Sequence, residues 1–277
     1  MKAVILAAGR GTRLRPLTDT MPKCLVQVHG KPLLQYQLEC LDHAGIQHCV
    51  IVVGYLADQI QRQFGSRFRN VRITYVVNER FLETNNLYSL WLARHELDDD
   101  ILLMEGDLLF EDDILRDLMD LDLANVAVVD QFQSFMDGTV ILADEGWATS
   151  MVLKSEQSAD FNYRSALKTV NIYALSRATM GRHFLPAMDR YVAEGVTGQF
   201  YEAIMAHLIA QGDLQLGVHL TGDRRWTEID TEEDLRQAEG ASPWTMADSY
   251  ADAMMTGAEE VAGRGAAPFG SPWLRRR

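Results

Sequence analysis

Short apolar runs alternate with amphipathic segments along the first half of the chain. The segments between the runs have helical spacing, and several of them follow Pro or end at Gly. This alternation predicts an α/β fold, with a Rossmann-like, mainly parallel sheet and helices on both faces. The expected strands are 3–7, 49–53, 71–77, 101–104 and 126–129, and the expected helices are 33–44, 55–64, 87–97 and 112–121.

The pattern changes after residue 130, where apolar runs and turns follow each other without regular helices between them. We expect a mixed α/β part over residues 131–240, packed on the first part. Its expected strands are 139–142, 150–153, 168–174, 214–220 and 226–229, and its expected helices are 177–194, 199–210 and 231–238. From residue 241 the chain is rich in Ala, Gly and Met, which is typical of a tail or linker, with one short helix at 246–261.

Charge and cysteine content narrow the class of protein. The formal net charge of −13 argues against a broad nucleic-acid surface but leaves room for a local basic pocket. Three cysteines without metal-ligand spacing favour a reduced, cytoplasmic protein. The apolar run at the N-terminus is too short for a signal peptide, and no stretch has the length of a membrane span. We therefore expect neither nucleic acid nor a membrane as a partner, and the oligomeric state stays open between a homodimer and linkage to a further domain.

A cation-rich glycine loop follows the first expected strand. Gly9 and Gly11 allow the backbone to approach a ligand, and successive N–H groups in such a turn form an anion-binding concavity. Four basic residues in or near the loop reverse the overall charge locally, which suits a triphosphate: Arg10, Arg13, Arg15 and Lys23.

Two common glycine motifs do not account for this loop. The Walker A pattern is absent, and the dinucleotide fingerprint needs a third Gly where Leu14 stands. The same fingerprint needs an acidic residue after the second strand, where the chain has Gly54.

The motifs resemble the nucleotidyltransferase family that includes sugar-1-phosphate nucleotidylyltransferases and phosphocholine cytidylyltransferases. The resemblance covers roughly residues 1–240, with the glycine loop, Gly54-Tyr55, the run 84–90, Gly106-Asp107 and the run 226–230 in the family's order. It implies a fold of the nucleotide-diphospho-sugar transferase type. One nucleotidyltransferase domain would then span 1–240, with a nucleotide-binding part at 1–130, an acceptor-binding part at 131–240 and a tail or linker at 241–277.

The run Asn85-Asn86-Leu87-Tyr88-Ser89-Leu90 is similar to the cytidylyltransferase branch. Sugar-nucleotide members usually have Pro where this chain has Cys24, and a Glu-Lys-Pro segment that this chain lacks. The runs 136–140 and 168–173 look like cytidylyltransferase domains joined to aminotransferase-like domains, among them phosphonate-pathway enzymes.

The resemblance implies transfer of CMP from CTP to a small phosphorylated or phosphonylated acceptor, either an aminoalkylphosphonate or a phosphocholine-like molecule, with release of pyrophosphate. The alternatives are a sugar-1-phosphate nucleotidylyltransferase that uses UTP or dTTP, and a non-catalytic nucleotide-binding module.

Three acidic residues are candidate ligands for Mg²⁺. Asp107 follows the carboxyl end of an expected parallel strand, where open α/β sheets bind ligands. Glu228 and Asp230 are two apart on a short strand, so we expect both on one side of it and converging with Asp107. The resemblance places the metal-binding acids at Asp107 and Asp230. A simple Gly-Asp turn, and a helix cap at Asp230, are the structural alternatives.

Two residues are the catalytic candidates and eight more are expected to bind the nucleotide. Lys23 and Arg13 are cations suited to the phosphates as pyrophosphate leaves. Backbone groups and Asn85 are expected to read the base, and the loop to hold the phosphates. The nucleotide-binding candidates are Ala7, Ala8, Gly9, Arg10, Gly11, Thr12, Asn85 and Gly106.

The acceptor-binding candidates are Asp137, Lys168, Tyr173 and Glu202. Lys168 lies among apolar residues of an expected strand, so it must reach a rim or meet an anion, with Arg164 a weaker candidate. Asp137 and Glu202 could pair with a primary ammonium. A choline group would favour an aromatic cage instead, drawn from Tyr173, Phe200, Tyr201 and Trp226. The chain has Asp137-Gly138-Thr139 where phosphocholine enzymes have a pocket tryptophan, which argues against choline.

Overall fold

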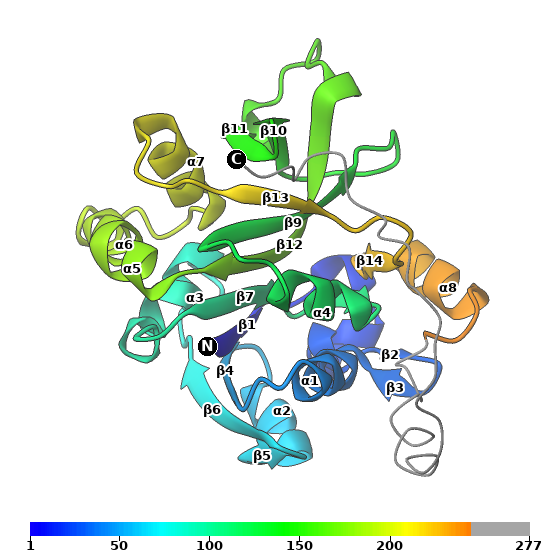
Figure 1. Cartoon of the computed structure of the whole chain (residues 1–277). Helices are drawn as coiled ribbons and strands as arrows, with labels where there is room; N and C mark the ends of the chain where they lie inside the picture. Colours follow the sequence, from blue (N-terminus) through cyan, green and yellow to red (C-terminus); the bar gives the residue numbers. More distant parts are fainter. Residues whose placement is uncertain (245–277) are drawn as a thin grey trace, which may run out of the picture.

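A ten-stranded mixed sheet runs through the middle of the structure, a computed structural model that describes residues 1–244 (Figure 1). Four parallel strands occupy one half of it: β1 (Lys2–Ala7), β4 (His48–Val53), β6 (Val71–Val77) and β7 (Ile101–Glu105). The full strand order is β10-β11-β13-β9-β12-β7-β1-β4-β6-β5. The α/β fold predicted from the strand–helix alternation is confirmed.

The second half of the chain inserts one long strand into the sheet of the first half. β12 (Ala166–Leu175) lies antiparallel between β7 and β9 (Asn125–Gln131). The remaining strands are β13 (Gly217–Leu220), parallel to β9, with β10 (Val140–Asp144) and β11 (Trp147–Val152) at one edge and β5 (Arg67–Phe68) at the other. Both parts of the chain thus build one sheet, and the division at residue 130 stays a prediction.

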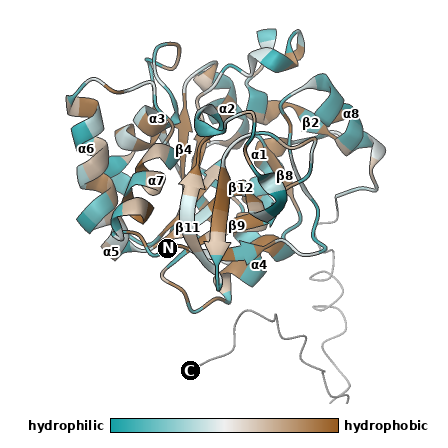
Figure 2. Cartoon of the chain, turned by 90° about the horizontal axis from the view of Figure 1, so that it is seen from above, coloured by the Kyte–Doolittle hydropathy of each residue, from teal (hydrophilic) through white to brown (hydrophobic). Residues whose placement is uncertain are grey.

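Helices cover both faces of the sheet because its central strands are apolar on both sides. Side chains such as Ile5 and Ile51 pack against α1 (Leu33–His43), α2 (Ala57–Phe64) and α4 (Asp113–Met119). Their neighbours Val4 and Val50 pack against a layer of helices on the opposite face of the sheet. Figure 2 shows the hydrophobic strands between these two layers. The elements of the second layer are α3 (Asn86–Leu92), α5 (Arg177–Thr179), a π-helical turn (Met180–Phe184), α6 (Leu185–Ala193) and α7 (Glu202–Gln211).

A small two-stranded sheet stands beside the main one. β8 (Leu108–Phe110) pairs antiparallel with β14 (Trp226–Glu228), and a hairpin of β2 (Gln27–Val28) and β3 (Lys31–Pro32) lies near α8 (Glu232–Gly240). The predicted cap of α8 is present, since the Thr231 hydroxyl accepts from the Asp234 N–H at 3.2 Å. The pattern did not predict β8, because three apolar residues after Gly-Asp carry no periodicity.

Residues 241–244 fold back onto the body of the protein. Trp244 is 8% exposed and its indole N–H donates to the carbonyl oxygen of Ala238 at 3.3 Å. The predicted helix at 246–261 lies outside the described residues. Within residues 1–244, no helix combines the length and hydrophobicity that a membrane crossing requires.

Candidate active site

A cavity of about 720 Å³ opens at the carboxyl ends of β1 and β7. This is the edge at which open α/β sheets hold their ligands. Most residues singled out from the sequence line this one cavity: Ala7, Ala8, Gly9, Gly11, Thr12, Arg13, Lys23, Asn85, Gly106, Asp107, Lys168, Glu202, Glu228 and Asp230. Segments more than 200 residues apart in the chain therefore share one space, and the individual roles of these residues stay predictions.

The two loop glycines have different structural tasks. Gly11 has a φ of 62° and starts the turn Thr12–Leu14, and a Cβ there would lie 2.9 Å from the Cβ of Lys23. Its carbonyl oxygen accepts from the Thr18 hydroxyl at 2.7 Å. At Gly9, by contrast, an added Cβ would meet no atom within 4 Å. Gly11 lets the loop pack on Lys23, whereas Gly9 leaves backbone open to the cavity.

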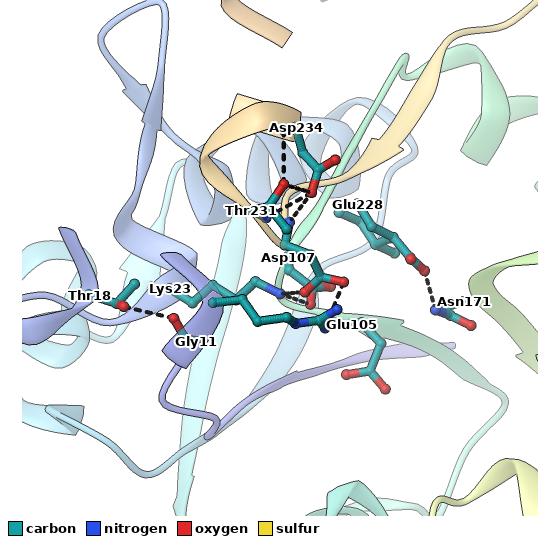
Figure 3. Close-up of polar contacts among 12 residues, drawn as sticks. Gly11, Thr18, Lys23, Glu105, Asp107, Asn171, Glu228, Thr231 and Asp234 are labelled. Carbon is teal, nitrogen blue, oxygen red and sulfur yellow. Dashed lines mark hydrogen bonds and ion pairs between the residues drawn. The ribbon is translucent and has the colours of Figure 1, made fainter. Parts of the chain in front are cut away.

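Lys23 lies between two carboxylates from distant parts of the chain (Figure 3). Its ammonium donates to Asp107 Oδ2 at 2.5 Å and to Asp230 Oδ1, and Arg13 pairs with Asp230 Oδ2 at 2.9 Å. Burial lowers the pKa of Lys23, but the charges of Asp107 and Asp230 outweigh this effect and raise its pKa. The result is a cluster of two cations and two anions at the cavity wall.

Glu228 faces a different partner set. Its Oε1 accepts from Asn171 Nδ2 at 2.6 Å (Figure 3). The same oxygen accepts from Lys168 Nζ at 3.3 Å, and Lys168 also donates to the carbonyl oxygen of Thr169 at 2.6 Å. Burial raises the pKa of the Glu228 carboxyl, and the charge of Lys168 opposes this shift. Lys168 is 2% exposed, so its charge is held at the cavity wall by these contacts.

The expected convergence of three carboxylates is therefore not observed. Within residues 1–244, no group of three or more His, Cys, Asp or Glu side chains is arranged to hold a metal. The rule that residues two apart point the same way applies within a strand, but β14 ends at Glu228. Asp230 lies beyond the strand, where its N–H donates to Asp234 Oδ2 at 3.0 Å.

Asp107 and Asp230 alone still fit a magnesium ion. Mg²⁺ is commonly bound through one or two carboxylates, with waters and substrate phosphates completing its shell. Both aspartates direct an oxygen at the same ammonium group, so their carboxylates already share one cation, and both line the cavity. This donor set suits a hard cation that arrives with a triphosphate.

Three of the predicted site residues do not line the cavity. Arg10 lies over the Tyr55 ring at 5.3 Å, and Asp137 pairs with Lys154 at 2.7 Å. Tyr173 is fully buried in β12 against Tyr201, at 5.9 Å between ring centroids. The prediction that Tyr173 contacts an acceptor is corrected, because its position in the middle of the sheet closes it off from the cavity.

The aromatic cage is also not formed. Among the four aromatic candidates, Phe200 lines the cavity, while Tyr173 and Tyr201 are buried in the core. The Trp226 indole N–H donates to Asp130 at 2.7 Å, and Trp226 is not among the residues that line the cavity.

Glu105, Asn86 and Asn171 are among the cavity residues that were not singled out from the sequence. Glu105 Oε1 accepts from Asn86 Nδ2 at 3.0 Å, and burial raises the pKa of Glu105 well above its ordinary value, with the charges of Asp107 and Glu202 adding to the shift. Their positions in the sequence could have identified Glu105 and Asn86, since Glu105 precedes Gly106-Asp107 and Asn86 belongs to the Asn-Asn run. Asn171, with a φ of 60°, belongs to the run 168–173, which was noted for its resemblance without a role for Asn171.

Comparison with known proteins gives a consistent set of relatives. Residues 2–129 match the family model for nucleotidyl transferases. The chain is 36% identical over 241 residues to the CMP-5'-(3-aminopropyl)phosphonate synthase of Streptomyces rubellomurinus, covering 86% of this chain and 38% of that protein. It is 43% identical over 121 residues to the choline-phosphate cytidylyltransferase of Streptococcus pneumoniae, covering 43% of this chain and 50% of that protein. The chain thus spans half the length or less of these two curated relatives.

Solved structures with the same fold include the CTP:phosphocholine cytidylyltransferase LicC from Streptococcus pneumoniae. The TM-score is 0.71 at 27% identity, and the match covers 86% of this chain and 97% of that one. A UDP-glucose pyrophosphorylase bound to UDP-glucose has a TM-score of 0.70 at 17% identity over 86% of this chain and 97% of that one, which supports the fold alone.

Proposed function

We propose that the chain is a member of the nucleotidyltransferase family and that it transfers CMP from CTP to a small phosphorylated or phosphonylated acceptor with release of pyrophosphate. The observation that carries the proposal is the cluster in which Arg13 and Lys23 meet Asp107 and Asp230 at one cavity. Phosphoryl transfer needs cations that bind the phosphate oxygens, and it needs carboxylates that hold a divalent ion.

In the proposed reaction an acceptor oxygen attacks the α-phosphorus of CTP. A bond forms between these two atoms, the bond from the α-phosphorus to the bridging oxygen breaks, and pyrophosphate leaves with its electrons. Lys23 and Arg13 place positive charge where the leaving group becomes more negative. Mg²⁺ held by Asp107 and Asp230 supplies further charge neutralisation at the phosphates when bound.

The acceptor part of the proposal depends on Lys168. The Glu228 carboxylate, which also accepts from Asn171, and the Thr169 carbonyl hold this lysine in one orientation at the cavity wall. A fixed cation there can orient the acceptor's phosphate or phosphonate, and a reactant already in position lowers the entropic part of the barrier. The names of the two relatives, one a phosphonate synthase and one a choline-phosphate enzyme, support an acceptor of this class.

A second candidate is transfer from UTP to a hexose 1-phosphate. It is supported by 35% identity over 164 residues to the UTP–glucose-1-phosphate uridylyltransferase AglF of Haloferax volcanii, which covers 57% of this chain and 66% of that protein. Thermal shifts with each of the four nucleoside triphosphates separate the two candidates. A tenfold tighter nucleotide, in excess, adds about 1.4 kcal/mol of stability.

Pyrophosphate release tests the main proposal. Wild-type protein is assayed with CTP, Mg²⁺ and a panel of phosphate and phosphonate acceptors, beside Asp107→Ala. We expect the substitution to lower the rate at least about 100-fold, since it removes charge at the reacting phosphates. The exposed Glu194→Ala, outside the cavity, is the matched control. Equal rates for wild type and Asp107→Ala would reject the assignment of Asp107.

A further inference from the structure

A buried carboxylate with an unsatisfied oxygen lies at the cavity wall. Glu202 is the first residue of α7, is 6% exposed and lines the cavity. Within residues 1–244, its Oε2 has no hydrogen-bond partner. A buried carboxylate oxygen without a partner is costly and rare, so its presence at a cavity indicates a ligand that donates to it.

Asn86 connects Glu202 to a second acid, the half-buried Glu105. The Asn86 side chain donates to Glu105 Oε1 at 3.0 Å, and its own oxygen accepts from the Tyr201 N–H at 2.9 Å, one residue before Glu202. Glu105 ends β7, Asn86 begins α3 and Glu202 begins α7. Three elements therefore present two carboxyl groups and one amide to the same space.

The cations of the cavity wall are already matched by other acids. Lys168 is paired with Glu228, and Lys23 and Arg13 are paired with Asp107 and Asp230. The remaining lining lysine, Lys154, pairs with Asp137. Among the ion pairs of residues 1–244, none involves Glu105 or Glu202, so this part of the wall is the one that calls for a positive ligand group.

We propose that Glu202, Glu105 and Asn86 form a subsite for the primary ammonium of the acceptor, which makes the acceptor an ω-aminoalkyl phosphonate or phosphate. This rests on the proposed function. A primary ammonium has three N–H donors for the oxygens of the subsite. A trimethylammonium has none and depends on aromatic faces. Of the aromatic residues in the described part of the chain, the cavity is lined by Phe81 and Phe200.

Three acceptors that share one phosphonate test the subsite: 3-aminopropylphosphonate, its N-trimethyl counterpart and propylphosphonate. With CTP and wild-type protein, we expect kcat/KM to be at least about tenfold higher for the amine than for either analogue, equivalent to about 1.4 kcal/mol. Glu202→Gln should raise KM for the amine and remove the preference for the amine over propylphosphonate. The exposed Glu194→Gln should keep the wild-type preference.

The comparison within wild-type protein does not depend on whether a variant folds. Equal or higher kcat/KM for the trimethyl compound would overturn the ammonium subsite and leave the proposed function intact. If no pyrophosphate is released with any of the three compounds, the proposed function is rejected instead. In that case calorimetric titration of the three acceptors tests the subsite. The ammonium subsite is overturned if the amine and propylphosphonate bind with equal affinity, or if neither binds.

Discussion

At the scale of single residues, the site is defined by how charges are matched. Lys23 pairs with both Asp107 and Asp230, whereas Glu202 lies buried without a cation at its free oxygen. A shared lysine holds two carboxylates in place, whereas a buried carboxyl without a cation favours its neutral form. Both effects have measurable consequences.

Lys23→Met should destabilise the protein and make its stability depend on magnesium. Without the ammonium, Asp107 and Asp230 repel each other at a half-buried position, at a cost on the order of 2 kcal/mol. Urea denaturation with and without Mg²⁺ measures this cost, and we expect the ion to restore part of the stability. Lys154→Met, which removes an exposed lysine from the same cavity, is the control. A Lys23→Met protein that is indifferent to Mg²⁺ would contradict the metal assignment.

Glu202 should make stability fall as the pH rises. Burial raises the pKa of Glu202 from 4.5 to about 7. The charge of Lys168 and the hydrogen bond with Asn86 oppose this shift, whereas the negative charge of Glu228 adds to it. Glu105 is a further acid close enough to interact with Glu202. Between these two pH values the unfolded chain has lost a proton that the folded chain keeps, so a higher pH favours unfolding. The loss begins near pH 4.5, is complete above pH 7 and is on the order of 3 kcal/mol.

Urea denaturation of wild type and Glu202→Gln at pH 5 and pH 8 checks this effect of pH. The glutamine variant cannot ionise at this position, so its free energy of unfolding should fall less between the two pH values. Identical pH dependence of the two proteins would show that Glu202 keeps an ordinary pKa.

At the scale of elements, a short turn joins the main sheet to the small one. β7 ends at Glu105, Gly106 turns the chain, and Asp107 leads into β8, which pairs with β14. This pairing brings Asp107 near the segment that carries Asp230, and both then reach Lys23. The relative position of Asp107 and Asp230 thus depends on the pairing of β8 with β14, which involves three residues of each strand.

Gly106→Ala should weaken this turn. An added Cβ would lie 2.9 Å from the Cβ of Ala7 and 3.0 Å from the carbonyl oxygen of Leu6, so β1 and β7 would have to separate, at about 1–3 kcal/mol. Gly9→Ala is the matched control, because an added Cβ there meets no atom within 4 Å. Thermal unfolding should show a lower Tm for Gly106→Ala alone. Equal Tm values for the two variants would refute the close approach at Gly106.

At the scale of the whole molecule, the two halves of the chain share one sheet. β12 carries Lys168 and Asn171 from the second half and lies between β7 and β9 of the first half. A third group of buried side chains joins three segments next to the acidic pair, through Leu14, Leu109 and Ile229, and it includes Trp244. Residues 241–244 are therefore part of the packed body.

Trp244→Ala should lower both stability and activity. The residue is 8% exposed and lies under the Arg225 guanidinium at 4.8 Å, so its loss should cost about 2–4 kcal/mol. Since Leu14 and Ile229 flank Arg13 and Asp230, we expect kcat for pyrophosphate release to fall even where the variant is fully folded. Denaturation and steady-state kinetics measure the two effects. Phe135→Ala, at a side chain 77% exposed, is the control, and a Trp244→Ala protein that matches it would show that Trp244 is dispensable.

The sequence by itself determined the local features of this protein. The apolar runs specify buried strands and the spaced residues specify helices, because burial and hydrogen bonding within an element depend on neighbours in the chain. The loop from Gly9 to Lys23 and the acid Asp107 were recognisable as candidate site residues for the same reason, since a phosphate or metal site is expected from their residue types and spacing.

Only the tertiary structure decided which of these features meet. Strand pairing between distant segments places β12 inside the sheet, buries Tyr173 and directs Glu228 to Lys168 rather than to Asp107. The same packing leaves Glu105 and Glu202 at one cavity wall. Such contacts join residues tens to hundreds of positions apart, and the energy that selects them comes from long-range burial, which no local pattern of residues records.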